Sequence, residues 1–308
     1  MMRPVLGIDL GASRIKAVVA GLDGAIHDRT LVPSRADEGP DVTLRVVSEI
    51  ARRMIAEHHV RIVGVGVCGP VDYGAGRLIE SPMLPGWSSV PVVDTIREDT
   101  GVPVVIENDA SCAMLGEWWL GAGERLPVVA GFTIGTGVGG GLVLDGEIYR
   151  GGSGWGAELG HISLAPEPRC PCGGHGCVGM LASIPATLTR YRELGGSSEV
   201  DDLEELIRLG DEGDARATEA LEASGGYLTD AARALVNVLN PNVLVLAGGM
   251  AVLSSALVDC IERGLRGTTF DGPDRTPVAA AKLGLYSGAI GAARAAALAS
   301  GKGPAQSA

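Results

Sequence analysis

The sequence has no uninterrupted run of about 20 apolar residues, which is the length that a helix needs to cross a bilayer. The opening Met-Met-Arg-Pro holds one basic residue, and the apolar stretch after it is too short for a signal peptide and lacks a small-residue cleavage site. These absences exclude a membrane-spanning protein and disfavour a secreted one. We therefore expect a cytoplasmic chain with no membrane partner.

Clusters of lysine and arginine are also missing, and the formal net charge is −12. A groove for nucleic acid needs such clusters to displace counterions from phosphates, so the sequence predicts no nucleic-acid partner. A polyanion such as ATP would instead be held by local backbone N–H groups, a metal ion and a few side chains.

Two common nucleotide-binding motifs are absent. No GxxxxGK[ST] string occurs, which excludes a P-loop. The glycine-rich string GTGVGG at 135–140 lies between two predicted strands, whereas the dinucleotide-binding fingerprint must open a helix. An NAD site is therefore disfavoured.

Strand and helix patterns alternate along the chain, which predicts an α/β fold. Apolar runs bounded by Gly or Pro predict strands at 4–9, 15–20, 62–68, 103–106, 128–134, 141–144 and 243–247. Helical spacing predicts helices at 43–59, 110–119, 203–208, 215–239 and 287–299. A chain of 308 residues can form two lobes, which we place at 1–110 plus about 288–308, and at 111–287.

The first turn that could hold phosphates is GIDLGAS at 7–13, between two predicted strands. Asp9 can hold the water shell of Mg²⁺, and Gly11 lets backbone N–H groups approach phosphate oxygens. Ser13 and Arg14 can add donors. An ordinary turn explains the same residues about equally well.

The second such turn is FTIGTGVGGG at 132–141. Glycines weaken a strand, so their number beside an apolar run indicates a close backbone approach or a tight hairpin. In a phosphate site, Thr136 would offer its hydroxyl to the β- or γ-phosphate. A plain hairpin remains the alternative.

Glu107, Asn108 and Asp109 end an apolar strand and begin a predicted helix. A carboxylate at a helix start is stabilised by the free N–H groups there, so Asp109 has a sufficient structural explanation as a cap. As a functional residue, Asp109 would orient a hydroxyl and accept its proton late in a loose transition state. The pKa of Asp109 need not be unusual for that role.

His161, Cys170, Cys172 and Cys177 follow the spacing H-x8-C-x-C-x4-C, which suits tetrahedral Zn²⁺. Disulfides fit badly, because three is an odd number, Cys-x-Cys closes a strained ring and the compartment is expected to be reducing. His175 lies inside the loop and is an alternative fourth ligand. Four protein ligands close the metal site, which disfavours a zinc hydrolase.

Glu158 stands three residues before His161. A carboxylate that accepts hydrogen bonds from two neighbouring hydroxyls is a common way to hold a sugar, and a metal-bound imidazole can present its free ring nitrogen beside it. The alternative is a solvated surface charge.

Taken in order, these motifs resemble the ROK family of bacterial sugar kinases and repressors, which has the two-lobed, actin-like (ribonuclease H-like) ATPase fold with an interlobe cleft. The resemblance extends over most of the chain. The strings that carry it are GIDLGASRIKA (7–17), GVGVCGPVD (64–72), SPMLPGW (81–87), ENDASCAMLGE (107–117), TIGTGVGGG (133–141), AELGHI (157–162), CPCGGHGC (170–177) and LVLAGGM (244–250).

The resemblance implies an ATP-dependent sugar kinase in which Asp109 is the catalytic base. Asn108, Glu158 and His161 would contact sugar hydroxyls, Gly69 would line the pocket, and a structural zinc would be bound by the histidine and three cysteines. ATP–Mg would be contacted by Asp9, Gly11, Ser13, Thr136, Gly137 and Gly249. Many members are dimers or tetramers, so we expect a homodimer or homotetramer. The repressor branch carries a helix-turn-helix segment before its first strand, and this chain begins at that strand, so we expect no DNA binding.

The sequence departs from the family pattern at three places. GASR replaces the usual GGTK, Ser111-Cys112 replaces Asn-Ala, and Gly179 replaces a glutamate that contacts hydroxyls at the anomeric end of the sugar. Losing hydrogen bonds to a charged acceptor costs about 1.5–3 kcal/mol. Glucose is therefore predicted to be a poorer substrate, which leaves a C7-cyclitol or an amino sugar open, and a non-catalytic sugar-binding regulator is the alternative of another class.

Overall fold

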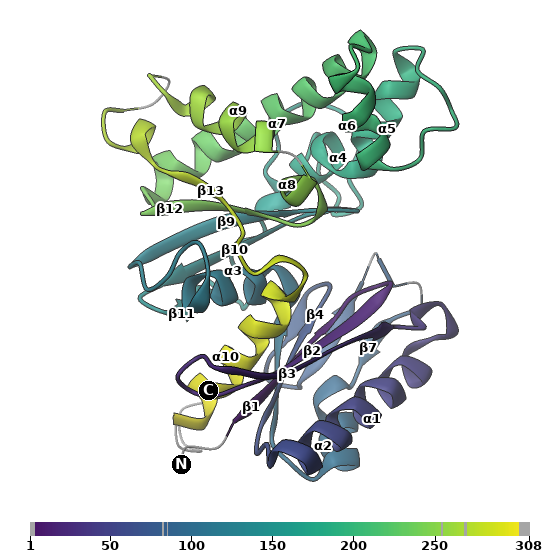
Figure 1. The fold of residues 1–308 in the computed structure, drawn as a ribbon, viewed down its shortest axis with the longest axis vertical. Coiled ribbons are helices and arrows are strands. Elements are labelled where there is room, and N and C mark those ends of the chain that lie inside the picture. Colours follow the sequence, from purple (N-terminus) through teal and green to yellow (C-terminus); the bar gives the residue numbers. More distant parts are fainter. Residues whose placement is uncertain (1–3, 82, 85, 254, 268–269, 302–308) are drawn as a thin grey trace. The chain divides into compact units, whose positions relative to one another are not determined.

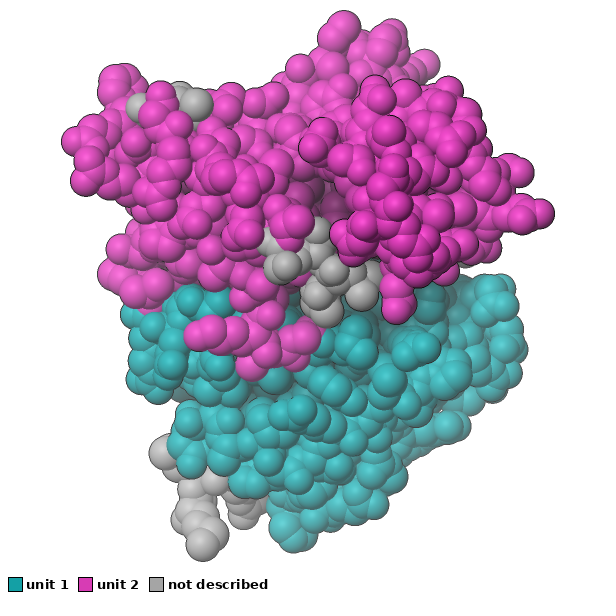
Figure 2. Space-filling model, turned by 45° about the horizontal axis from the view of Figure 1, so that its top comes forward, with its two compact units in different colours: residues 1–125, 146–157, 285–308 teal, residues 126–145, 158–284 magenta. Residues whose placement is uncertain are grey.

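The computed structural model describes residues 4–81, 83–84, 86–253, 255–267 and 270–301. The chain forms two compact units, distinguished by colour in Figure 2. The first comprises residues 1–125, 146–157 and 285–308, and the second comprises residues 126–145 and 158–284. The predicted α/β class is confirmed, because each unit contains a mixed sheet with helices packed against it (Figure 1).

The first unit is built on a sheet with the strand order β3-β2-β1-β4-β8. The strands β1 to β3 form an antiparallel meander, and β4 and β8 continue the sheet parallel to β1. The bounds are β1 Val5–Leu10, β2 Arg14–Ala20, β3 Ile26–Pro33, β4 Val63–Val67 and β8 Val104–Asn108. This parallel arrangement brings the ends of β1, β4 and β8 to one edge of the sheet.

Helices cover both faces of this sheet, which explains why β1 and β4 are continuous apolar or glycine runs. Helices α1 (Pro40–His58) and α2 (Val92–Thr100) lie on one face, and α3 (Asp109–Leu120) and α10 (Ser287–Gly301) lie on the other (Figure 1). Gly7 and Gly64 allow α10 to approach closely, because a Cβ at either position would collide with its backbone.

Helix α3 belongs to the first unit, although our division at residue 110 assigned it to the other lobe. Two glycines account for this packing. A Cβ at Gly116 would collide with the carbonyl of Ser287, and a Cβ at Gly291 would collide with the carbonyl of Cys112. Helices α3 and α10 therefore touch backbone to backbone within one core, and the chain enters the second unit only at residue 126.

The second unit repeats the same plan of a hairpin followed by parallel strands. Strands β9 (Val128–Ile134) and β10 (Val138–Leu144) are antiparallel, and β12 (Val243–Ala247) and β13 (Val278–Ala280) extend the sheet parallel to β9. Its helices are α4 Val178–Ala182, α5 Ile184–Glu193, α6 Leu203–Asp211, α7 Ala215–Leu239, α8 Gly249–Leu253 and α9 Ser255–Leu265.

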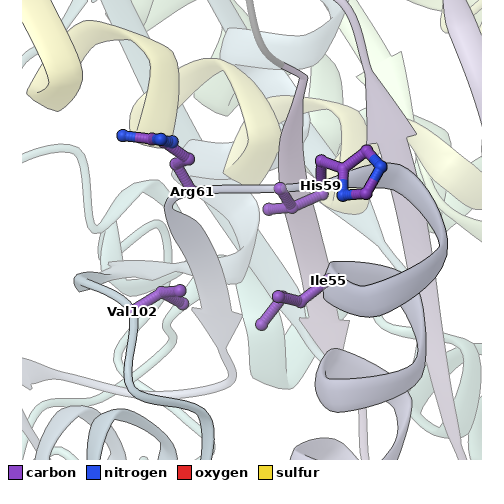
Figure 3. A pocket seen from close by; sticks show the side chains of 5 residues that line it. Ile55, His59, Arg61 and Val102 are labelled. Carbon is purple, nitrogen blue, oxygen red and sulfur yellow. The ribbon is translucent and has the colours of Figure 1, made fainter.

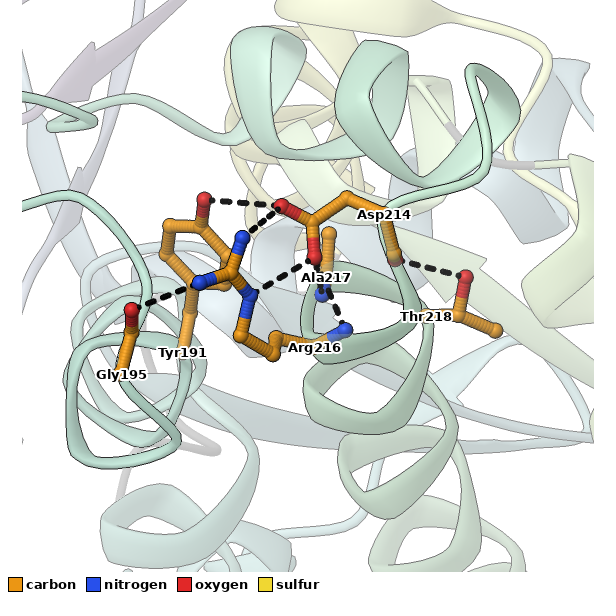
Figure 4. A network of polar contacts seen from close by, with 6 residues as sticks. All are labelled: Tyr191, Gly195, Asp214, Arg216, Ala217 and Thr218. Atoms are coloured by element: carbon orange, nitrogen blue, oxygen red, sulfur yellow. Dashed lines mark hydrogen bonds and ion pairs between the residues drawn. The ribbon is translucent and has the colours of Figure 1, made fainter.

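Helix α7 begins at a polar network that ties it to the end of α5 (Figure 4). The Asp214 carboxylate accepts hydrogen bonds from the backbone N–H groups of Arg216 and Ala217, at 2.9 and 3.3 Å. The Arg216 guanidinium pairs with Asp214 at 3.0 Å and donates to the Gly195 carbonyl at 2.8 Å. The Tyr191 hydroxyl donates to Asp214 at 3.4 Å.

Short elements complete the fold. A small antiparallel sheet has the order β5-β6-β7. The remaining bounds are β5 Val71–Asp72, β6 Arg77–Glu80, β7 Ser88–Val90, β11 Glu147–Ile148 and the 3-10 turns Ala36–Glu38, Leu159–His161, Pro273–Arg275 and Gly284–Tyr286. Over the part of the chain that the structure describes, no helix is both long and apolar enough to cross a bilayer.

Candidate active site and metal centre

The β1–β2 turn, which is the first predicted phosphate turn, is compact. The Gly11 N–H donates to the Arg14 carbonyl at 3.1 Å, which closes the turn. Ser34, the residue that follows β3, holds the turn in place. Its N–H donates to the Ser13 carbonyl at 3.0 Å, and its hydroxyl donates to the Ala12 carbonyl at 2.5 Å. Ser13 and Arg14 are exposed at the tip, so both side chains are accessible to a ligand.

Sequence reasoning missed Lys16, which stands directly opposite Asp9 in the β1–β2 ladder. Its Nζ lies 2.8 Å from Asp9 Oδ2, and the two side chains are only 19% and 12% exposed. The sequence held one signal for this pair, because the register of the predicted β1–β2 hairpin places Lys16 opposite Asp9. A largely buried carboxylate needs a partner close by, and Lys16 is that partner.

Asn108 ends β8 and caps α3. Its Oδ1 accepts the Ser111 N–H at 3.0 Å, and its Nδ2 donates to the Gly69 carbonyl at 3.3 Å. Asp109 is the first residue of the helix, and its Oδ1 accepts the N–H of Ala110 at 2.9 Å. The capping role that we had weighed for Asp109 therefore belongs to Asn108.

The pKa of the Asp109 carboxyl is raised to about 7. Burial is the main cause, because it penalises the charged form, and the negative charge of Asp9 acts in the same direction. The Ala110 N–H, the Cys68 thiol and the positive charge of Lys16 oppose the shift. Asp109 is thus a carboxyl that changes its protonation state near neutral pH, a property common among functional residues.

The β9–β10 turn is the second predicted phosphate turn. The Gly135 N–H donates to the Gly137 carbonyl at 2.9 Å, and Thr136 and Gly137 are exposed. A Cβ at Gly135 or Gly137 would meet no atom within 4 Å, and neither residue has a positive φ. Packing and backbone conformation therefore do not require these glycines, which is consistent with a ligand that approaches the backbone. Gly249 begins α8 in the same unit.

The predicted zinc ligands lie together in the second unit. The Nδ1 of His161 is 3.6 Å from the Sγ of Cys170, and the Sγ atoms of Cys172 and Cys177 are 3.7 Å apart. All four ligand atoms lie within 4.8 Å of one another. Tetrahedral zinc, with bonds of about 2.3 Å to sulfur and about 2.0 Å to nitrogen, needs separations of about 3.5–3.8 Å. The residues fit this metal.

The turn around the cysteines is shaped by glycine. Gly176 has φ +56° and lies against the backbone of Ala165, where a Cβ would collide. The group of possible metal ligands around these cysteines, in the part of the chain that the structure describes, includes His161 and does not include His175. The backbone carbonyl of His175 instead accepts a hydrogen bond from the Ser163 hydroxyl at 2.6 Å.

Glu158 and His161 flank the short 3-10 turn Leu159–His161. The His161 N–H donates to the Glu158 carbonyl at 3.0 Å, and Gly160 lies so close to Val138 that a Cβ would collide with the Val138 carbonyl. The side chains of Glu158 and His161 are exposed. Both are therefore available to a ligand on this unit.

Gly179 is the second residue of α4, next to the same turn. A Cβ there would lie 3.4 Å from the Gly160 carbonyl oxygen and 3.7 Å from the Val138 nitrogen, which are ordinary contacts. The backbone at Gly179 would therefore accept a larger residue, so packing does not explain this glycine.

A surface hollow of about 430 Å³ lies elsewhere on the first unit, beside the end of α1. Ile55, His59, Val60, Arg61 and Val102 line it, and Figure 3 shows four of these side chains around the opening. None of the predicted site residues lines this hollow.

The sheets and the two glycine hairpins define the class of protein, which is the actin-like ATPase fold. A model described as "ROK family" matches residues 5–299, and the chain belongs to this family.

Solved structures agree with this assignment. A ROK hexokinase from Thermus thermophilus has 34% sequence identity and a TM-score of 0.85, with 97% of this chain and 100% of that chain covered. A ROK family glucokinase from Streptomyces griseus, in complex with glucose and AMPPNP, has 27% identity and a TM-score of 0.83, with 96% and 99% covered.

Sequence relatives include a kinase and a repressor. A glucokinase of Thermotoga maritima is 31% identical over 80% of this chain and 82% of its own length. The xylose repressor of Bacillus subtilis is 28% identical over 78% of this chain, which covers 63% of the repressor.

Proposed function

We propose that this ROK-family sugar kinase transfers the γ-phosphoryl group of ATP to the primary hydroxyl of a hexose or hexose-like substrate, with Asp109 as the base. The observation that carries the proposal is the state of Asp109. Asn108 performs the capping, while the Asp109 carboxyl stands at the end of β8 with its pKa raised to about 7.

In the proposed reaction, the substrate oxygen bonds to the γ-phosphorus as the bond from that phosphorus to the bridging oxygen of ADP breaks. A sugar hydroxyl is far too weak an acid to be ionised beforehand by a carboxylate. Asp109 therefore orients the hydroxyl and accepts its proton late in a loose transition state. Catalysis depends mainly on positioning and on charge neutralisation.

The nucleotide is assigned to the two glycine hairpins. The backbone N–H group of Gly137 and the hydroxyls of Ser13 and Thr136 are the proposed donors to phosphate oxygens, and Gly11, which has no side chain, would let a phosphate approach its turn closely. The full proposed set is Asp9, Gly11, Ser13, Arg14, Thr136, Gly137 and Gly249. Mg²⁺ on the phosphates would neutralise charge that develops in the transition state.

Zinc is assigned to His161, Cys170, Cys172 and Cys177 as a structural ion. Because His161 directs Nδ1 toward Cys170, its Nε2 remains available for a sugar hydroxyl. The metal would hold the imidazole in place, and Glu158 would accept hydroxyl hydrogen bonds beside it. Gly69 and Asn108 complete the proposed sugar-binding set.

The base is tested by Asp109→Asn in an ADP-release assay, with Asp94→Asn, an exposed residue of α2, as the matched control. We expect turnover to fall by about 10²–10⁴-fold in Asp109→Asn and to stay unchanged in the control. Full phosphotransfer by Asp109→Asn would remove the mechanism. Sugar binding without turnover in the unaltered protein would instead support a non-catalytic regulator.

Gly179 narrows the choice of phosphoryl acceptor, because the carboxylate that would contact the anomeric end of a hexose is missing at this position. This absence favours a ring altered at that end, such as a C7-cyclitol or an amino sugar, over ordinary glucose. The test is a panel of hexoses, amino sugars and cyclitols, with Gly179→Glu and, as control, Gly226→Glu on the exposed face of α7. We expect Gly179→Glu to raise kcat/KM for glucose by about tenfold to a hundredfold. If glucose is already the best substrate by a wide margin and Gly179→Glu changes nothing, the altered-pocket hypothesis is wrong.

A further inference from the structure

We propose that Arg150 and Tyr73 form a bracket that positions the Asn108–Asp109 pair for phosphoryl transfer. This inference rests on the proposed function, because it assigns no chemistry of its own to either residue. Arg150 and Tyr73 are positioning residues that act through Glu107 and Asn108. All five residues belong to the first unit.

The first part of the bracket is an ion pair at Glu107, the residue immediately before Asn108. Glu107 is 3% exposed, so its carboxylate is buried at the end of a core strand. The Arg150 guanidinium approaches it with two nitrogens: Nε lies 3.3 Å from Oε2, and Nη2 contacts Oε1. A two-pronged pair fixes direction as well as distance.

The second part is Tyr73, which lies between Arg150 and the backbone of Asn108. The Arg150 guanidinium carbon is 5.0 Å from the centre of the Tyr73 ring. The Arg150 side chain and the Asn108 backbone also act on the Tyr73 hydroxyl, and both lower its pKa against the larger effect of burial. Burial raises the pKa of Tyr73, so the hydroxyl stays neutral, and its oxygen is the group that can accept from the Arg150 side chain and the Asn108 backbone.

The segment after Arg150 is folded onto the same bracket. The Gly156 N–H donates to the Arg150 carbonyl at 2.8 Å, closing a loop. Gly154, with φ +90°, lies against the Tyr73 ring, where a Cβ would stand 3.1 Å from the nearest ring carbon. Arg150 is therefore held by its backbone as well as by its side chain.

Energetics favour positioning over simple stabilisation. The Arg150 side chain is 45% exposed, so solvent screens its pair with Glu107, and a screened ion pair contributes little to stability. The Arg150–Glu107 ion pair and the Tyr73 contact both act on the end of β8, just before the proposed base. Ser111 and Gly69 hold only the side chain of Asn108. A displacement of about 1 Å at a reacting group can cost about 100-fold in rate.

Tyr73→Phe is the sharpest variant, because it keeps the ring under Arg150 and removes the contact to Asn108. We expect kcat to fall about tenfold, KM for ATP to stay within about twofold, and Tm to change little. Tyr286→Phe is the matched control, because that ring also lies beside an arginine, Arg29 at 5.3 Å, and is not placed in the site. An unchanged kcat in Tyr73→Phe would overturn the role of Tyr73.

Arg150→Met leaves Glu107 buried without its partner, which endangers folding, so it is paired with Glu107→Gln. The double variant removes both charges. We expect its Tm to recover toward that of the unaltered protein while kcat remains about tenfold to a hundredfold low. If kcat recovers together with Tm, the pair is purely structural and the proposal is wrong.

The tests of the bracket can fail independently of the test of Asp109 as the base. If Asp109→Asn retains full activity, the proposed function fails regardless of the bracket. If Asp109→Asn is inactive while Tyr73→Phe and the double variant turn over normally, only the bracket fails.

Discussion

At the residue scale, Asn108 and Asp109 are adjacent side chains that could both cap α3, and Asn108 is the one that does so. Asn108 caps α3 and contacts Gly69, which leaves the Asp109 carboxyl largely surrounded by protein at the start of the helix. Burial without a strong cation partner raises the pKa of Asp109 to about 7, and Lys16 only partly offsets the effect. A carboxyl buried in this way lowers the stability of the fold.

Asp109→Asn should therefore stabilise the ligand-free protein. A carboxyl whose pKa is about 7 when folded and about 4 when unfolded destabilises the fold progressively as pH rises from about 4 to about 7. The variant removes this penalty, and we expect a gain of about 1–3 kcal/mol in the free energy of unfolding at pH 8, vanishing near pH 4. Denaturant unfolding at several pH values measures it, with Asp94→Asn as control. A loss of stability at pH 8 would contradict the burial explanation.

At the element scale, glycines decide where helices meet. Gly116 and Gly291 bring α3 and α10 into backbone contact, and Gly7 and Gly64 bring α10 onto the sheet. These contacts explain why α3, which begins at the proposed base, belongs to the first unit.

Gly291→Ala should separate α3 from α10. The added Cβ would collide with the Cys112 carbonyl, a backbone atom that cannot rotate away. We expect a loss of at least about 2 kcal/mol in the free energy of unfolding. Gly226→Ala in α7 is the control, because its Cβ meets nothing within 4 Å, and it should stabilise the protein by about 0.5–1 kcal/mol. Equal stability of the two variants would contradict close packing at Gly291.

The start of α7 should depend on pH through Asp214. Its pKa is lowered to about 2, chiefly by the Arg216 side chain. The folded value lies below the ordinary one, so the stabilisation is present above about pH 4 and is lost as pH falls toward 2. Asp214→Asn keeps a capping side chain and removes the charge. We expect Tm to fall by about 1–3 °C at pH 7 and the difference from the unaltered protein to shrink at pH 3. Glu219→Gln, an exposed change on α7, should show no such pH dependence.

At the scale of the whole molecule, the net charge of −12 gives no general attraction for a polyanion, so anion binding must be local. The two units repeat a hairpin followed by parallel strands, and each hairpin turn is rich in small residues. The proposed metal ligands, in contrast, all belong to the second unit.

Removing the metal should therefore destabilise the second unit. We expect about one zinc per chain, and we expect chelation to lower the Tm and to weaken sugar binding, because a structural zinc contributes folding free energy. Cys172→Ser should reproduce both effects, whereas Cys260→Ser, outside the cluster, should not. A metal-free protein with unchanged Tm and unchanged sugar affinity would contradict the assignment.

The sequence by itself determined the features whose parts lie within a short stretch. The α/β class, the long helices, both glycine turns and the quartet of His161 and three cysteines could be predicted because local spacing and backbone preference decide them. Tertiary structure alone decided the contacts of Arg150 with Glu107 and with the Tyr73 ring, and the raised pKa of Asp109. These depend on burial and on neighbours dozens of residues away, which strand register and helix packing bring together.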